Sequence, residues 1–317
     1  MINILTVTLP IFLLIGVGYV AAYFKIVGAA DIASIGRFVL NITMPALIIV
    51  AFQSHPIGQI LNWTYLMAYG IGAVATFGLT TLCGVYLLKK DLSTSAIYGM
   101  GTSVSNSAYI GYPVVSAIIG PIGAICMALN FLVENIIIIP MALILADAGS
   151  GKGQRVSVLI RQILYKLTKN PIIIGIVIGL AISLSGMTLP APVNKALSLL
   201  AGVSSPTALF VIGGSLLGLR LKGMRGDIAL VFIFKLVVHP LMALLSVMVL
   251  FPGIEREFAI GAVLFASVPM MSVYPIFAEA YQLGQRAAAA VFVATMLSFF
   301  TIPIAVMVVH FLLPLGG

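Results

Sequence analysis

The chain contains 317 residues, of which 62% are hydrophobic and 8% are charged, and its mean hydropathy is +1.22. This composition excludes an ordinary soluble domain, in which charged residues make up about a quarter of the chain. The formal net charge of +8 would by itself suit a nucleic acid or an anionic lipid surface, so the placement of the charges along the chain matters.

Apolar stretches of about 20 residues recur from end to end, each long enough to cross the ~30 Å hydrocarbon core as a helix. Continuous apolar runs such as 172–178 are unlike the alternating strands of a membrane β-barrel. The first stretch has no basic residue before it and Lys25 after it, so we interpret it as a span and not as a cleavable signal peptide. We predict an all-α polytopic membrane protein with ten transmembrane helices, at residues 4–24, 33–53, 62–88, 93–118, 121–146, 170–188, 192–218, 227–250, 256–281 and 286–313.

The basic residues gather on one side of this predicted topology. That side holds Lys25, Arg37, Lys89, Lys90, Lys152, Arg155, Arg161, Lys166, Lys169, Arg220, Lys222, Arg225 and Arg286. The other side holds only Lys195 and Arg256. Because cytoplasmic loops carry the excess of Lys and Arg, we expect both termini to be extracytoplasmic, in a multi-pass protein of the cell inner membrane. Topology then accounts for the positive charge, and no nucleic-acid partner is expected.

Prolines recur at nearly constant spacing in the two halves of the chain. Those of the first half are Pro10, Pro45, Pro113 and Pro140, and those of the second are Pro171, Pro206, Pro275 and Pro303. Two related halves with five spans each must insert in opposite orientations, so the pattern predicts two inverted five-helix repeats. We expect the first repeat at 1–146, a basic cytoplasmic linker at 147–169 and the second repeat at 170–317.

The fourth and ninth spans are expected to break at mid-membrane. The fourth carries Asn106, Ser107 and Pro113, and the ninth carries Ser272 and Pro275. Proline removes a backbone donor and pushes the preceding residue out of the helical region, and unpaired backbone groups at this depth are costly unless they line a cavity or meet a ligand. If the two spans cross, two helix N-termini meet and offer N–H donors to a carboxylate. The alternative is that these prolines only kink packed helices.

The backbone around the two tyrosines that precede these prolines, Tyr112 and Tyr274, is predicted to add orienting hydrogen bonds. With Gly111, these residues complete the predicted substrate site at the two breaks.

Three ionisable residues lie inside predicted spans. Glu134 is near the centre of the fifth span with Asn130 on the same helical face. It has a coupling or substrate-proximal role, or it is part of a fixed ion pair or a buried neutral carboxyl. Lys235 and His239 are four residues apart on the eighth span. Lys235 either supplies a counter-charge or snorkels to the headgroups, and His239 either titrates or only packs. Trp63 and Tyr65, at the start of the third span, are interpreted as anchors at the membrane surface.

The segment Asn106-Ser-Ala-Tyr-Ile-Gly111-Tyr-Pro113 resembles the first helix break of the auxin efflux carrier family. The segment from Pro269 to Glu279 resembles the second helix break of that family. The run Asn41-Ile-Thr-Met-Pro45 is similar to the bacterial branch, whose members lack the long hydrophilic loop of the plant carriers. The resemblance covers the whole chain. It implies a scaffold of spans 1, 2, 6 and 7, a transport domain of the other six spans, a homodimer, an elevator-like motion and substrates such as malonate and malate. It adds Asn41 to the substrate site. Sodium-coupled bile acid carriers are more distantly similar.

These observations predict a secondary active transporter of a small organic anion, with Asn106 and the backbone at the two breaks binding the carboxylate. Coupling to protons or to sodium stays open, and no cofactor or metal is expected. The alternatives are a sodium-coupled or amino-acid-like substrate carrier, and a receptor-like or channel-like membrane protein. The chain lacks Walker spacing, zinc-ligand spacing and a nucleophile paired with a base, so we do not expect an enzyme.

Overall fold

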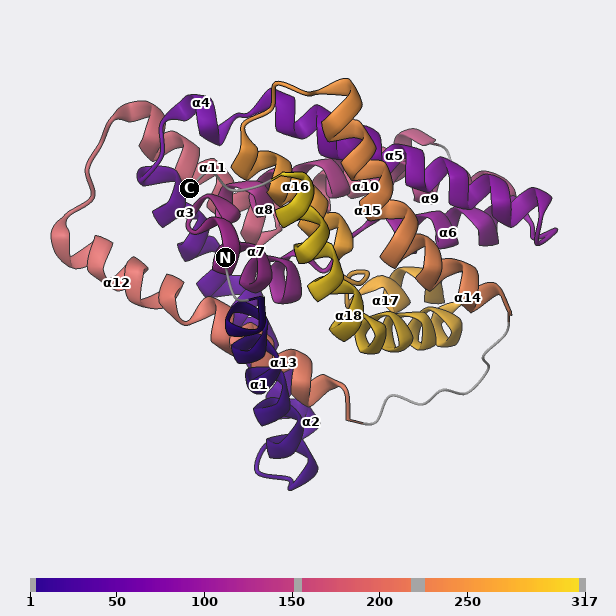
Figure 1. The fold of residues 1–317 in the computed structure, drawn as a ribbon, viewed down its shortest axis with the longest axis horizontal. Helices are drawn as coiled ribbons and strands as arrows, with labels where there is room; N and C mark the ends of the chain where they lie inside the picture. Colours follow the sequence, from indigo (N-terminus) through magenta and orange to yellow (C-terminus); the bar gives the residue numbers. More distant parts are fainter. Residues whose placement is uncertain (1–3, 151–155, 218–225, 314–317) are drawn as a thin grey trace. The chain divides into compact units, whose positions relative to one another are not determined.

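The computed structural model describes residues 4–150, 156–217 and 226–313, and these ranges are almost entirely helical (Figure 1). The chain packs as two compact units. Unit 1 consists of Met1–Trp63, Ala108–Leu129 and Lys166–Gly218, and unit 2 consists of Thr64–Ser107, Asn130–Tyr165 and Leu219–Gly317. Each unit therefore draws on both halves of the sequence.

Six helices of the described ranges are long and apolar enough to cross a membrane, and there are seven if a bent pair at 160–185 counts as one span. Many large apolar side chains on them are exposed, such as Val177 at 60% and Phe300 at 71%. Apolar exposure of this kind is what a lipid-facing surface requires. The predicted all-helical membrane class is confirmed, and the number of ten spans remains a prediction.

Unit 1 is built from helices that pack in close pairs. Its elements are α1 (Ile4–Tyr23), α2 (Ala29–Phe38), η1 (Val39–Thr43), α3 (Met44–Gln53), α4 (Ile57–Ile60), α7 (Tyr112–Ile119), α11 (Pro171–Ser185), α12 (Ala191–Gly202) and α13 (Ser204–Ser215). The main pairs are α1 with α13 and α3 with α11 (Figure 1). At the first pair, Gly18 lies against the backbone of Phe210, and Gly213 lies against the backbone of Ile15. Small residues at such crossings let two helix backbones approach each other directly.

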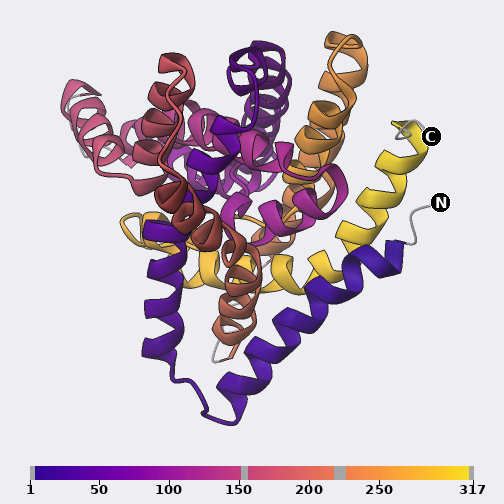
Figure 2. The same cartoon turned by 90° about the vertical axis from the view of Figure 1, so that its left-hand side faces the viewer.

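Unit 2 holds the remaining spans. Its elements are α5 (Trp63–Tyr86), α6 (Leu92–Ser103), η3 (Glu134–Ile138), α9 (Ile139–Ser150), α14 (Gly226–Ile233), η4 (Phe234–Val238), α15 (His239–Leu245), η5 (Ser246–Leu250), α16 (Arg256–Ser267), α17 (Tyr274–Glu279) and α18 (Gly284–Leu312). Three further helices cross the division between the units: η2 (Ser107–Gly111), α8 (Ile122–Val133) and α10 (Val156–Thr168). The helix α18 changes direction partway along its length (Figure 2), and the internal Pro303 supplies the cause.

All five π-helical segments, η1 to η5, end two residues before a proline: Pro45, Pro113, Pro140, Pro240 or Pro252. In η1, η3 and η4 the residue between the segment and the proline donates its N–H to a carbonyl five residues back. A proline ring clashes with the carbonyl four residues before it, and widening that turn relieves the clash. Proline therefore sets the position of each wide turn.

Two expectations about surface segments change. Tyr65 is fully buried and donates a hydrogen bond to Asn130, so its interpretation as a membrane-surface anchor is wrong, whereas Trp63 is 71% exposed. The expected linker 147–169 includes the end of α9 and the helix α10. Lys152 and Arg155 of that linker, and Arg220, Lys222 and Arg225, lie outside the described residues.

Candidate functional site

The breaks of the fourth and ninth predicted spans meet within unit 2. After α6 the chain becomes extended at Val104, and after α16 it becomes extended at Val268, which precedes Pro269. Ser105 and Met270 form an antiparallel β-bridge, and the Asn106 N–H donates to the Pro269 carbonyl at 2.8 Å. The two extended segments thus satisfy part of each other's backbone, as buried backbone groups require. The predicted interruption of both spans is confirmed.

Side chains reinforce this meeting of the breaks. The amide Nδ2 of Asn106 donates to Ser272 Oγ at 2.8 Å. Asn106 is 4% exposed, whereas Ser272 is exposed. Tyr274, which begins α17, is fully buried and its ring packs against Gly101 of α6. The half-buried Pro275 follows at the second position of α17.

The backbone and hydroxyl of Ser105 form the centre of a buried polar network. The Ser105 N–H donates to the Glu134 carboxylate at 2.9 Å, and the Lys235 ammonium donates to Ser105 Oγ at 2.6 Å. The Tyr69 hydroxyl donates to Glu134 Oε1 at 2.8 Å. All four residues are buried to 3% exposure or less. A buried charge needs this kind of pairing and hydrogen bonding to offset its lost hydration.

Lys235 has three acceptors within reach: Ser105 Oγ, His239 Nδ1 at 2.8 Å and the Ala266 carbonyl at 3.4 Å. These match the three donors of an ammonium group. The alternative in which Lys235 snorkels to the headgroups is excluded, because its side chain is fully buried. As Nδ1 of His239 accepts, its proton belongs on Nε2, which is buried and has no hydrogen-bond partner among the described residues.

Two tyrosines of α5 donate hydrogen bonds to Glu134 and to the neighbouring Asn130. Tyr65 donates to Asn130 Oδ1 at 2.9 Å, one helical turn from the bond between Tyr69 and Glu134. The rings of Tyr65 and Tyr69 are parallel, with centroids 6.2 Å apart, and the ring of His239 lies 5.8 Å from that of Tyr69. The prediction that Asn130 and Glu134 share one helical face is confirmed by these bonds. Glu134 and Lys235 both occupy wide turns, η3 and η4, which are common at functional positions.

Four other predicted site residues belong to the described part of unit 1. Asn41 lies in η1 and is exposed. Gly111 and Pro113 are buried at the start of α7, and Tyr112 between them is half-buried. Ser107, the last residue of the unit 2 segment that holds Asn106, is 2% exposed.

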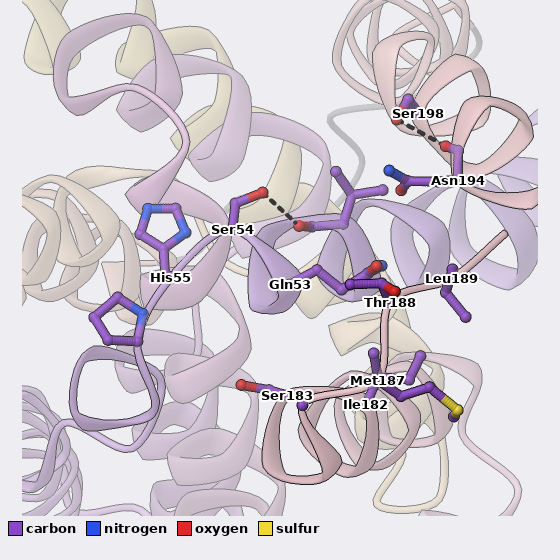
Figure 3. A pocket seen from close by; sticks show the side chains of 13 residues that line it. Gln53, Ser54, His55, Ile182, Ser183, Met187, Thr188, Leu189, Asn194 and Ser198 are labelled. Atoms are coloured by element: carbon purple, nitrogen blue, oxygen red, sulfur yellow. Dashed lines mark hydrogen bonds between the residues drawn. The ribbon is translucent and has the colours of Figure 1, made fainter. Parts of the chain in front are cut away.

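Unit 1 contains two cavities that share Val50, Ser54 and His55. One has a volume of about 670 Å³ and is lined by Tyr112 and Ser116 of α7 as well. The other has a volume of about 620 Å³, and there Gln53, Ser54 and His55 lie opposite Asn194 and Ser198 of α12 (Figure 3). His55 Nδ1 donates to the Ala51 carbonyl at 2.8 Å, which leaves Nε2 of the neutral ring as an acceptor. Tyr112 is the only predicted site residue that lines either of these two cavities.

Sequence reasoning missed Ser105, Tyr69 and His55. Ser105 stands in a run of small polar residues that offers no basis for choosing one of them, and Tyr69 is one of many aromatics. A signal for Tyr69 does exist, because it lies four residues after Tyr65 just as Glu134 lies four residues after Asn130.

A model of the family described as membrane transport protein matches residues 3–308. The chain belongs to this family. It is the family of the auxin efflux carriers that the two breaks resemble, so the chain is a multi-pass membrane transport protein and not an enzyme.

Two relatives of the family align with nearly the whole chain. A protein of Rhizobium meliloti named "Putative malonate transporter" is 25% identical over 303 residues, which covers 95% of this chain and 94% of that protein. A protein of Methanothermobacter thermautotrophicus named "Uncharacterized transporter" is 24% identical over 302 residues, with 93% and 95% covered.

Proposed function

We propose that the chain is a secondary active transporter of a small organic anion, a carboxylate or dicarboxylate, which it moves across the cell membrane. The observation that carries this proposal is the meeting of the two breaks at Asn106 and Ser272, beside the buried network of Lys235. Backbone and side-chain donors in a water-poor interior favour a carboxylate. The name of the Rhizobium meliloti relative supports the same substrate class.

Within unit 2, we assign carboxylate binding to the Asn106 amide and the Ser272 hydroxyl, with Ser107 beside them and the backbone at Tyr274 and Pro275 as support. Ser272 is exposed, so a ligand can reach it. Within unit 1, Gly111, Tyr112, Pro113 and Asn41 are proposed as substrate-binding residues, and for Tyr112 the adjoining cavity supports this role.

Coupling is assigned to Glu134, Lys235 and His239. With Glu134 ionised, its charge balances that of Lys235 through Ser105. Protonation of Glu134 leaves the Lys235 ammonium in excess, and a buried excess cation attracts an anion. This arrangement supports proton-coupled anion transport, and sodium coupling is the alternative that the transport assay distinguishes from it.

We propose an elevator-type transport cycle, in which each protomer of a homodimer alternates between an inward-open and an outward-open state. Two inverted five-helix repeats, with ten spans and both termini extracytoplasmic, would build each protomer. The matched prolines support the repeats, and the division of the chain into two compact units supports a mechanism with two moving parts.

Counterflow in proteoliposomes tests the proposal. Vesicles are loaded with malate, malonate, indole-3-acetate or a neutral amino acid, and uptake of labelled malate, or of the same labelled amino acid, is followed with and without sodium and at several external pH values. We expect exchange with carboxylates that increases as the external pH falls. Asn106→Ala should reduce it at least tenfold, whereas the control Asn135→Ala should not, because the hydrogen bond that the described residues give Asn135 stays within its own chain segment, at Phe131. Exchange with the amino acid alone would refute the substrate class, and an unchanged Asn106→Ala variant would refute the site.

A further inference from the structure

The helix α10 carries an apolar stripe along one face. Positions 156, 159, 160, 163, 164 and 167 are all Val, Ile or Leu, at the spacing of one side of an α-helix. Apart from Val158, the rest of the helix is polar or basic, and no acidic residue occurs between 156 and 169. This pattern is typical of a helix that lies along a boundary between an apolar and a charged environment.

Of the stripe side chains that the structure describes, two are exposed and that of Leu167 is partly exposed. Ile160 is 42% exposed and Leu164 is 57% exposed, and Tyr165 beside them is 66% exposed. The basic side chains Arg161 and Lys166 are exposed as well. A stripe that packed on its own protein would instead be buried in the way that the other helices bury their contact faces.

The chain between α10 and α11 ends the first helix and starts the second as a separate one. Asn170 Oδ1 accepts from the N–H groups of Ile172 and Ile173, at 2.9 and 3.4 Å, and Pro171 occupies the first helical position. This is a complete helix start, so α11 begins as a new helix. The axes of Ile160–Thr168 and Pro171–Ser185 differ by 64°.

The bend decides between two placements for α10. If α10 continued α11 through the hydrocarbon, the exposed charges of Arg161 and Lys166 would meet lipid tails, which is costly. If α11 follows the membrane normal, as the predicted sixth span would, a helix turned by 64° from it runs closer to the membrane plane than to that normal. At the membrane surface the apolar stripe reaches the acyl chains and the basic residues reach the lipid phosphates.

We propose that α10 is an interfacial helix that binds the surface of an anionic phospholipid bilayer. Ile160 and Leu164 enter the boundary of the acyl chains, and Arg161, Lys166 and Lys169 hold the phosphates. Charge complementarity and direct continuity with α11, part of the predicted sixth span, favour the lipid surface as the occupant of the stripe. The inference is independent of the transported substrate.

Depth measurements on the full chain in vesicles test this proposal. Cys83 and Cys126 are replaced by Ala, and single spin-labelled cysteines are placed at Ile160 and Leu164 on the stripe and at Gln162 and Thr168 on the polar face. Collision with oxygen, which concentrates in lipid, and with a water-soluble nickel chelate is measured in vesicles of phosphatidylcholine with phosphatidylglycerol. We expect the ratio of oxygen to nickel collisions to be several-fold higher at the two stripe positions. Equal ratios at all four positions, or stripe labels closed to both reagents by covering protein, would overturn the proposal.

The lipid charge is tested in the same vesicles. Replacing phosphatidylglycerol by phosphatidylcholine, or introducing Arg161→Gln, Lys166→Gln and Lys169→Gln together, should lower the ratio at Ile160 and Leu164 at least twofold. A matched triple change of exposed basic residues elsewhere, Lys25→Gln, Arg37→Gln and Lys89→Gln, should leave it unchanged. A ratio that responds to neither the lipid nor the charges of α10 would refute the recognition of anionic lipid.

Discussion

The Nζ atom of Lys235 lies 2.6 Å from the Oγ atom of Ser105, although 130 positions separate the two residues in the sequence. Through this bond the wide turn η4 holds the break that follows α6. The same serine uses its backbone N–H to hold Glu134. One small residue therefore connects an acid, a base and a backbone break, and most of the predictions below concern this connection.

Removal of Lys235 alone should be more harmful than removal of both charges. Lys235→Met leaves the buried Glu134 carboxylate without the cation linked to it through Ser105, and the loss of this buried partner should cost about 1–3 kcal/mol of stability. Lys235→Met combined with Glu134→Gln should be more stable than Lys235→Met alone. Thermal unfolding in detergent, followed by fluorescence, measures both variants. Additive losses in the double variant would show that the two groups do not interact.

Ser105→Ala should weaken transport with little loss of folded protein. The change removes one of the three acceptors of Lys235 and keeps the backbone N–H that serves Glu134, so the buried network should lose about 1–3 kcal/mol of interaction free energy. Carboxylate exchange should fall roughly tenfold, by the conversion of about 1.4 kcal/mol per factor of ten. Ser103→Ala is the matched control, since among the described residues its buried hydroxyl bonds to Gly99 of its own helix. Equal exchange rates in the two variants would contradict the role of Ser105.

Gly101→Ala should destabilise the contact between α6 and Tyr274. A Cβ atom at position 101 would lie 2.6 Å from Cζ of the buried Tyr274 ring, so the ring would have to move. Overpacking of this kind typically costs about 1–3 kcal/mol. Gly78→Ala is the control, because a Cβ there meets nothing within 4 Å. The midpoint of thermal unfolding should be lower for Gly101→Ala than for Gly78→Ala. Similar midpoints would disprove the close packing.

Pro240→Ala should disturb the orientation of Lys235. Without the proline ring, the turn at Phe234–Val238 can tighten to an α-helix, which rotates the preceding residues by roughly 100° relative to the following ones. Lys235 would then leave Ser105, and carboxylate exchange should fall about as far as in Ser105→Ala. Pro192→Ala, at the exposed start of α12, controls for loss of a proline as such. Full exchange by Pro240→Ala would mean that the wide turn does not depend on the proline.

Much of unit 2 could be predicted from its sequence. Proline and small polar residues at mid-span indicated both breaks, because a membrane interior penalises such residues unless they have a purpose. Glu134, Lys235 and His239 stood out for the same reason, and the structure gathers all three around Ser105 or Lys235. Ionisable groups inside spans are therefore visible from sequence alone.

The exact partners could not be predicted, because they depend on how the helices pack. Tyr65 looked like a surface anchor from its place near the start of a span, yet it is buried against Asn130. Ser105 gave no signal because a neutral serine is inexpensive at almost any depth. The wide turns add a further obstacle, since each rotates the helix beyond it and so changes which residues face inward. The segment 147–169 is predicted only as a basic linker, although the spacing of its apolar residues is that of the helix α10.

The wide turns also have a consequence for comparing relatives of this chain. A π turn contains one residue more than the α turn that spans the same part of a helix. A homologue that lacks Pro140 and the wide turn before it would therefore need one residue fewer between Glu134 and Ile138 to keep the same helix ends. Such a gap in an alignment would mark a change in the direction of the acidic side chain, and not a shortened helix.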